Sequence, residues 1–227
     1  MSEEPRAFGT AVPPTAPPGA GAPPRERAVN APWPVVAATG LLVAVFVWQL
    51  SQGQAAIERY ALIPIELSAG RPVGLFGHIF LHGGWIHLFF NSTALLAFGA
   101  PVARLFGFGL GGALRFALFF LLCGLLGGLT FWALHPAGAV PLVGASGAIS
   151  GLMGAAARLI ERRGLVGHPF SRTALRFVMP WIVLNLLLAA AGTAFALPIA
   201  WEAHLGGLFA GWLLIGAFAP RRSRPAG

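Results

Sequence analysis

A serine lies between small residues at the start of an apolar segment, in the string Gly144-Ala145-Ser146-Gly147. Small neighbours leave its hydroxyl reachable and let other backbone approach it. A serine hydroxyl is a poor nucleophile until a base takes its proton. One such string is weak evidence, because Gly, Ala and Ser are also common where membrane helices pack. A catalytic role therefore requires a base and an oxyanion site nearby.

Histidine is the natural base, because its reference pKa lies near neutral pH. His204 lies near the start of the last apolar segment, and His87 and Asn91 lie four residues apart near the start of an earlier one. That spacing puts the last two on one helix face, where they and the Ser146 backbone N–H could donate to an oxyanion. On a helix, Glu202 points about 200° away from His204. We therefore expect a Ser–His dyad rather than a triad through Glu202.

Two missing residue types exclude other protease chemistries. The sequence contains no Asp and no Lys. A paired-aspartate protease, a Ser-His-Asp triad in its usual form and a Ser-Lys dyad are therefore excluded. No HExxH string occurs, which removes the common zinc-protease pattern. The single cysteine, Cys123, excludes an internal disulfide.

The composition is that of a polytopic membrane protein. Of 227 residues, 56% are hydrophobic and only 10% are charged, and the mean hydropathy is +0.75. We predict an all-α bundle of six transmembrane helices, at residues 33–50, 85–103, 114–134, 142–157, 177–197 and 200–219. Residues 51–77 contain prolines and glycines that interrupt helices, so we expect a long loop there, partly in the membrane interface.

Arginine placement predicts the orientation. Arginines follow the second, fourth and sixth predicted spans, as alternating cytoplasmic loops require. Both termini are then cytoplasmic: a disordered Pro-rich tail at 1–32, a six-helix transmembrane domain at 33–220 and a basic tail at 221–227. The formal net charge of +8 is spread between apolar spans rather than clustered on a face, so no nucleic-acid partner is expected.

Five polar side chains are predicted to share one membrane depth. Each of them lies just before or near the start of a segment that enters the membrane from the outer side. They are His82, His87, Asn91, Ser146 and His204. At 1.5 Å per residue they fall within roughly 15 Å of the outer face. Polar side chains are costly against lipid, so we expect them to face the bundle interior or a water-filled hollow.

Two glycine pairs predict how the serine and the histidine meet. Gly147/Gly151 and Gly207/Gly211 are GxxxG pairs on the fourth and sixth spans. Such pairs allow close helix contact. They also occur widely in ordinary helix packing, so they support the site only together with its polar residues.

Three separated motifs resemble those of the rhomboid family of intramembrane serine proteases. The segment from His82 to Asn91 is similar to the family's HxxxxHxxxN, residues 144–147 to its GxSG, and residues 203–207 to its AHxxG. The resemblance implies that Ser146 is the nucleophile and His204 the base. It also implies that His87 and Asn91 stabilise the oxyanion.

The resemblance assigns structural roles near the site as well. His82 matches a histidine that organises the outer loop, and Gly144 and Gly147 belong to the GxSG motif. Ser150 occupies a place where many members carry an aromatic side chain that packs on the catalytic histidine. Ser150-Gly151 repeats the Ser-Gly pair but lacks the preceding glycine, so we favour Ser146. We expect His78 to be an interfacial histidine.

The resemblance implies an integral membrane serine endopeptidase. The Gly-rich composition without Asp or Lys suggests a bacterial source, so we expect it in the inner membrane of a bacterium. Its substrates would be single-span membrane proteins cut near the outer face, and it would need no metal or organic cofactor. One alternative is a catalytically silent rhomboid-like scaffold that binds membrane helices. The other is a metal or haem protein that uses His78, His82, His87 and His204.

Overall fold

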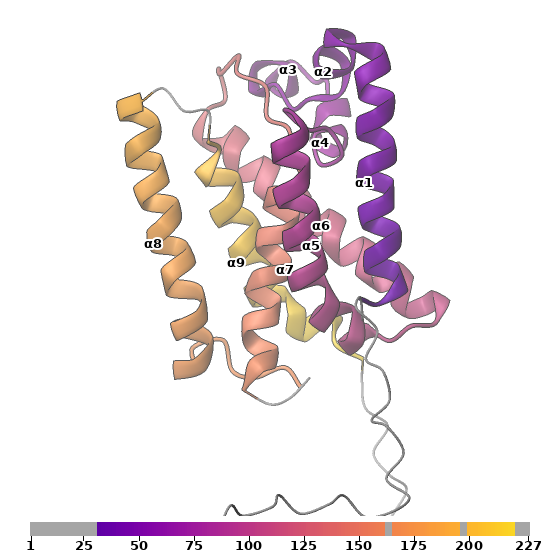
Figure 1. Cartoon of the computed structure of the whole chain (residues 1–227). Coiled ribbons are helices and arrows are strands. Elements are labelled where there is room, and N and C mark those ends of the chain that lie inside the picture. The colour runs from indigo at the N-terminus through magenta and orange to yellow at the C-terminus, as the bar shows by residue number, and fades with distance from the viewer. Residues whose placement is uncertain (1–30, 162–164, 196–198, 221–227) are drawn as a thin grey trace, which may run out of the picture. The chain divides into compact units, whose positions relative to one another are not determined.

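The computed structural model describes residues 31–161, 165–195 and 199–220, and within them it contains nine helices and no strand. Their bounds are α1 (Trp33–Gln52), α2 (Gln54–Tyr60), α3 (Pro64–Ser68), α4 (Val73–Gly77), α5 (Trp85–Phe106), α6 (Leu110–Leu134), α7 (Ser146–Ile160), α8 (Arg172–Phe195) and α9 (Trp201–Phe218) (Figure 1). The tails predicted at 1–32 and 221–227 lie, apart from residues 31 and 32, outside the described residues.

Among the described helices, α1, α5, α6 and α8 are long and apolar enough to cross a membrane. Helix α7 is apolar but has only 15 residues. Helix α9 has 18 residues, and Glu202 and His204 lie in its first turn. The prediction of an all-helical protein is confirmed, with four of the six predicted spans meeting these criteria of length and composition.

The fourth predicted span begins four residues later than expected. Residues 142–145 precede α7 instead of belonging to it, because Leu142 is engaged in a short antiparallel bridge with Leu62, with N···O distances of 2.9 and 3.1 Å. Gly144 has φ +125°, which is incompatible with a helix. Ser146 is consequently the first residue of α7.

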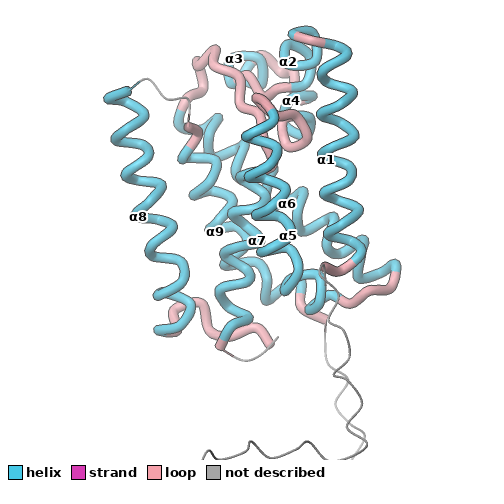
Figure 2. The backbone as a smooth tube through the Cα atoms, in the orientation of Figure 1, coloured by secondary structure: helices cyan, strands magenta, loops and turns pink. Residues whose placement is uncertain are grey.

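The segment predicted as a long loop contains three short helices. Pro64 begins α3, and Pro72 immediately precedes α4. Proline suits the first turn of a helix because its missing N–H has no intrahelical partner there. The prolines therefore start helices here as well as ending them, and α2–α4 gather at the end of the bundle where α5 begins (Figure 2).

Helix α7 is the centre of the bundle. It packs against α9, α6, α5 and α8, while α1 packs mainly on α5. Small residues allow the closest contacts: a methyl group added at Gly207 would run into the carbonyl oxygen of Gly147, and one at Gly211 into that of Gly151. The contact between the fourth and sixth predicted spans through their glycine pairs is confirmed.

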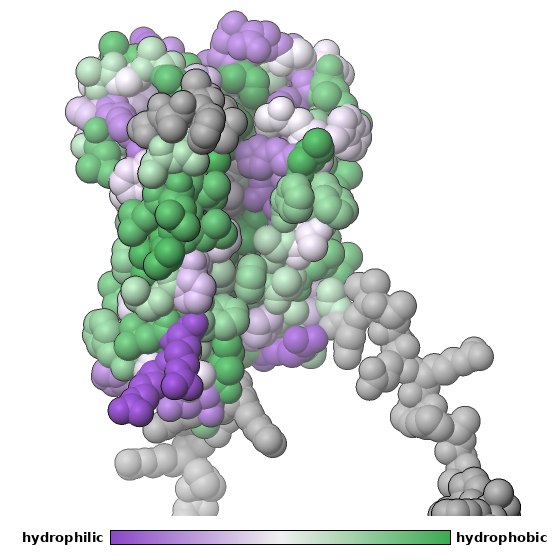
Figure 3. All heavy atoms as spheres, turned by 60° about the vertical axis from the view of Figure 1, so that its left-hand side comes forward, coloured by the Kyte–Doolittle hydropathy of each residue, from purple (hydrophilic) through white to green (hydrophobic). Residues whose placement is uncertain are grey.

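Large apolar side chains lie on the outside of the bundle. They include Ile86, Phe89 and Phe90 on α5 and Leu186 and Leu187 on α8. Figure 3 shows an apolar band on the face that comes forward in that view, with polar residues nearer its two ends. A soluble monomer rarely exposes so much contiguous apolar surface, so this surface indicates contact with lipid.

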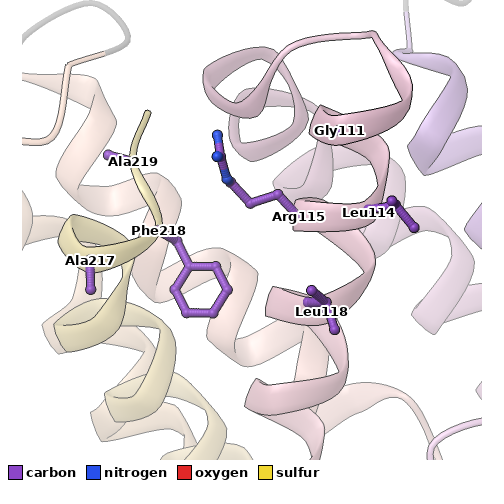
Figure 4. A pocket seen from close by; sticks show the side chains of 7 residues that line it. All are labelled: Gly111, Leu114, Arg115, Leu118, Ala217, Phe218 and Ala219. Carbon is purple, nitrogen blue, oxygen red and sulfur yellow. The ribbon is translucent and has the colours of Figure 1, made fainter. Parts of the chain in front are cut away.

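A groove of about 630 Å³ lies between the start of α6 and the end of α9 (Figure 4). Arg115 extends into it, and Leu118 and Phe218 form apolar walls. Its lining residues 217–219, at the end of α9 and directly after it, begin roughly 20 Å along the helix axis from His204. The groove is therefore separate from the polar cluster at the other end of α9.

Candidate active site

The structure brings Ser146 and His204 together. Nε2 of His204 lies 2.8 Å from Oγ of Ser146, although the two residues are 58 positions apart in sequence. Ser146 is the first residue of α7 and His204 lies in the first turn of α9. This distance is normal for a hydrogen bond, so the imidazole can accept the hydroxyl proton without any movement of the backbone.

Glycines hold the two helix starts at this separation. A methyl group at Gly147 would lie 3.1 Å from the carbonyl oxygen of Ala203, the residue before His204. A methyl group at Gly127 of α6 would lie 2.6 Å from the same oxygen. Helices α6, α7 and α9 thus converge on backbone with no side chains between them. That close packing fixes the backbone positions from which the Ser146 and His204 side chains extend.

The other ring nitrogen of His204 has a partner that sequence reasoning missed. Nδ1 lies 2.8 Å from Oδ1 of Asn185 on α8, and the Asn185 side chain is fully buried. The Trp181 ring, one turn earlier on α8, lies 6.4 Å from the imidazole between centroids. The available signal was a single amide within an apolar run. Asn185 thus holds the His204 ring by a hydrogen bond, and Trp181 lies beside that ring.

Glu202 points away from His204, as its helical spacing predicted. Its Oε1 lies 2.7 Å from Nε2 of His135, in the connection after α6. Ser150 is buried one turn beyond Ser146 on α7, and the hydroxyl paired with His204 is that of Ser146.

His87 lies against the turn that precedes the serine. Its Nδ1 accepts a hydrogen bond of 3.3 Å from the Gly83 backbone N–H, so Nε2 carries the proton in the neutral ring. A methyl group at Gly144 would lie 2.8 Å from that Nε2 and 3.7 Å from Oγ of Ser146. His87 and Ser146 therefore flank the same glycine, and the imidazole has an N–H directed to this region.

Asn91 is buried on α5, one turn after His87. Within the described part of the chain, its Nδ2 has no hydrogen-bond partner. A buried amide donor without a partner costs free energy, and such donors are typical of sites that bind a further group. Its placement one turn from His87 agrees with the predicted shared helix face.

The backbone of His82 is held by the side chain of Gln49 on α1. The Gln49 side chain accepts from the His82 backbone N–H at 2.9 Å and donates to the His82 carbonyl oxygen at 2.7 Å. The His82 and His87 rings lie edge to face, 5.2 Å apart. Burial, with a smaller contribution from His87, lowers the pKa of His82 to about 4. His82 thus fixes the entry to α5, and Gln49 is a second residue that sequence reasoning missed.

His78 is buried inside the protein, between the α2–α4 segment and α6. Its Nδ1 lies 2.9 Å from the Gly74 carbonyl oxygen, and its own carbonyl oxygen accepts from the Gly144 N–H at 2.8 Å. The ring packs against Gly128 of α6. His78 therefore links the α2–α4 segment to the turn before Ser146. Among the residues that the structure describes, no three His, Cys, Asp or Glu side chains are grouped as metal ligands would be.

The chain matches a known protein family. A family model for the Rhomboid domain matches residues 69–221, which is more than half of the chain. The chain belongs to the rhomboid family. It is therefore an integral membrane protein of a family that includes named proteases, and the residues discussed above from His78 to His204 all fall within the matched region.

Three relatives illustrate the range of similarity. The Rhomboid protease GluP of Bacillus subtilis is 35% identical over 141 residues, which are 61% of this chain and 24% of that one. RHOMBOID-like protein 5 of Arabidopsis thaliana is 33% identical over 136 residues, 60% of this chain and 40% of that one. Rhomboid protein 1, mitochondrial, of Saccharomyces cerevisiae is 29% identical over 208 residues, 84% of this chain and 56% of that one. This chain thus spans between a quarter and somewhat over half of these relatives' length.

Proposed function

We propose that this protein is an intramembrane serine endopeptidase with Ser146 as nucleophile and His204 as general base. The observation that carries the proposal is the 2.8 Å contact between Oγ of Ser146 and Nε2 of His204. Membership of a family that contains a named rhomboid protease supports the same chemistry.

The proposed reaction proceeds in two halves. Oγ of Ser146 attacks the carbonyl carbon of the scissile peptide while its proton passes to Nε2 of His204. The tetrahedral intermediate collapses, the C–N bond breaks, and the leaving amine takes that proton. Water then attacks the acyl-serine, gives a proton to His204, and the C–O bond breaks as the proton returns to Oγ. Bond changes and protons balance without any cofactor.

The oxyanion is proposed to form between α5 and the start of α7. The N–H of His87 Nε2, the free Nδ2 of Asn91 and the Ser146 backbone N–H are the candidate donors. Donors fixed before the reaction stabilise the developing charge most strongly in a water-poor site. Gly144 brings the His87 ring close to this position because it has no side chain.

We further propose that six helices cross the membrane: α1, α5, α6, α7, α8 and α9. The 15 residues of α7 rise roughly 22 Å, less than the hydrocarbon thickness of about 30 Å. A helix that reaches the cytoplasmic side therefore begins below the outer surface, and so does Ser146. The arginine distribution supports cytoplasmic termini. The proposed location is the inner membrane of a bacterium. The proposed membrane domain covers residues 33–220, with tails at residues 1–32 and 221–227.

The proposed substrates are single-span membrane proteins cut near the outer face. The backbone of a membrane helix is internally hydrogen-bonded, so a scissile peptide must leave its helix before Ser146 can reach it. Helix-breaking residues near the cleavage position are expected to increase the rate.

The test compares three variants in liposomes that contain tagged single-span substrates. Ser146→Ala and His204→Ala are expected to abolish cleavage, while Ser150→Ala, which removes the neighbouring serine of the same helix, retains it. A serine-reactive fluorophosphonate is expected to label the wild type and not Ser146→Ala. Undiminished cleavage by Ser146→Ala overturns the proposal, and substrate binding without cleavage or labelling by the wild type supports a silent scaffold.

A further inference from the structure

Among the described side chains of α8, Asn185 is the one that hydrogen-bonds to His204. Most of α8 faces outward, and its neighbours Leu186 and Leu187 are half or more exposed. The Asn185 side chain, in contrast, is fully buried. Polar residues in membrane helices are costly and turn inward to partners. The partner here is the imidazole of the proposed base.

The backbone of α8 decides which end of the amide faces His204. Asn185 contacts the Trp181 carbonyl oxygen at 2.9 Å on one side and Nδ1 of His204 at 2.8 Å on the other. A carbonyl oxygen can only accept a hydrogen bond, so the amide NH2 must face Trp181. Oδ1 is left for His204, and Oδ1 can only accept.

The imidazole tautomer follows from this orientation. Because Oδ1 accepts, Nδ1 of His204 must carry the hydrogen. In the neutral ring Nε2 then has the free lone pair, and this nitrogen faces Oγ of Ser146 at 2.8 Å. The carbonyl of Trp181 thus determines, through Asn185 and His204, that the serine hydroxyl donates its proton to the base.

We propose that Asn185 is a positioning residue that holds His204 in the Nδ1–H tautomer and in the orientation required to deprotonate Ser146. This inference rests on the proposed function and extends the predicted dyad to a chain of three side chains from α8, α9 and α7. The Nδ1–H to Oδ1 bond persists when Nε2 takes the serine proton, because the imidazolium ion donates from both nitrogens. Glu202 has no part in this chain, since it pairs with His135.

The enzymatic test uses two replacements of Asn185 in the full-length protein reconstituted in liposomes. Asn185→Leu keeps the same number and branching of side-chain heavy atoms but offers no acceptor, and we expect kcat to fall by about 10- to 100-fold with KM and the thermal unfolding temperature close to wild type. Asn185→Asp keeps an oxygen at the same reach, and we expect it to restore most of kcat. Leu186→Ala, on the lipid-exposed side of the same helix, is the matched control and keeps wild-type kcat.

A spectroscopic test does not depend on cleavage. In protein labelled with 15N-histidine, the resonances of His204 are identified by their loss in His204→Ala. We expect the Nδ1–H pattern in the wild type and in Asn185→Asp, and a change toward the Nε2–H pattern in Asn185→Leu. An unchanged tautomer in Asn185→Leu overturns the positioning role, as does a wild-type kcat in that variant.

The outcomes separate the two proposals. If Ser146→Ala cleaves as well as the wild type, the protease assignment fails whatever Asn185 does. If Ser146→Ala is inactive while Asn185→Leu has wild-type kcat and tautomer, the assignment stands and only the role of Asn185 is overturned.

Discussion

The carboxylate of Glu202 and the imidazole of His135 are paired at 2.7 Å. Only 7% of the Glu202 side chain is exposed, against 45% of the His135 side chain. The pair joins the first turn of α9 to the end of α6. It therefore lies beside the His204 helix turn without touching the proposed base.

Removal of His135 is expected to weaken the fold and spare the chemistry. His135→Ala leaves the buried Glu202 carboxylate without this partner, which costs roughly 1–3 kcal/mol for a buried polar group. The unfolding temperature in detergent should fall, while kcat at 25 °C stays close to wild type because Ser146 and His204 keep their contact. A large loss of kcat with an unchanged unfolding temperature contradicts this division.

Gly144 is expected to tolerate no side chain. Alanine there must adopt φ near +125°, and its methyl group would lie 2.7 Å from Cε1 of His87. We expect Gly144→Ala to lower kcat/KM by about 100-fold or more, because a displacement of about 1 Å in the site has that effect. The control is Gly83→Ala, whose methyl lies at an ordinary 3.6 Å from Nδ1 of the same ring. Similar rates for the two variants contradict the prediction.

Much of the fold was predictable because lipid imposes simple patterns. A membrane-length apolar run has few alternatives to a helix, so α1, α5, α6 and α8 lie close to the predicted segments. The separation between Ser146 and His204 followed from two glycine pairs, since close backbone contact needs residues without side chains.

Other features depend on partners that are distant in sequence. Asn185 pairs with His204 across 19 positions, and Gln49 with the His82 peptide across 33. Hydropathy records each as one polar residue within an apolar run and contains no information on its partner. The late start of α7 has the same origin. Leu142 pairs with Leu62, which is distant in sequence, and hydropathy does not reveal this bridge.

His78 is expected to make stability depend on pH. Burial lowers the pKa of His78 from 6.5 to about 4. Below pH 6.5 the unfolded chain therefore binds a proton that the folded protein does not, and the free energy of unfolding falls by up to about 3 kcal/mol by pH 4. Above pH 6.5 both states are neutral at this site and the dependence vanishes.

The measurement for His78 is unfolding in detergent between pH 7 and pH 4.5. His78→Gln cannot titrate, so its stability should fall less steeply than that of the wild type. A residual slope should remain because the pKa of His82 is also lowered to about 4. His168→Gln, at an exposed position, should keep the wild-type slope. Identical slopes for the wild type and His78→Gln contradict the prediction.

The contact between α7 and α9 is expected to fail when Gly207 gains a methyl group. That methyl would run into the carbonyl oxygen of Gly147, and backbone cannot move aside as a flexible side chain does. Overpacking of this kind costs about 1–3 kcal/mol or more, and the forced separation lengthens the contact between Ser146 and His204.

Gly216→Ala on the same helix is the matched control for Gly207→Ala. Among the residues that the structure describes, its methyl meets Nη2 of Arg158 at an ordinary 3.7 Å and nothing nearer. Both variants gain the same helix propensity of about 1 kcal/mol over glycine, so the difference between them isolates the packing. We expect Gly207→Ala to unfold at a lower temperature and to lose most fluorophosphonate labelling of Ser146, while Gly216→Ala matches or exceeds the wild type in both. Wild-type labelling of Gly207→Ala would mean that close approach of the two helices does not position the serine and the histidine.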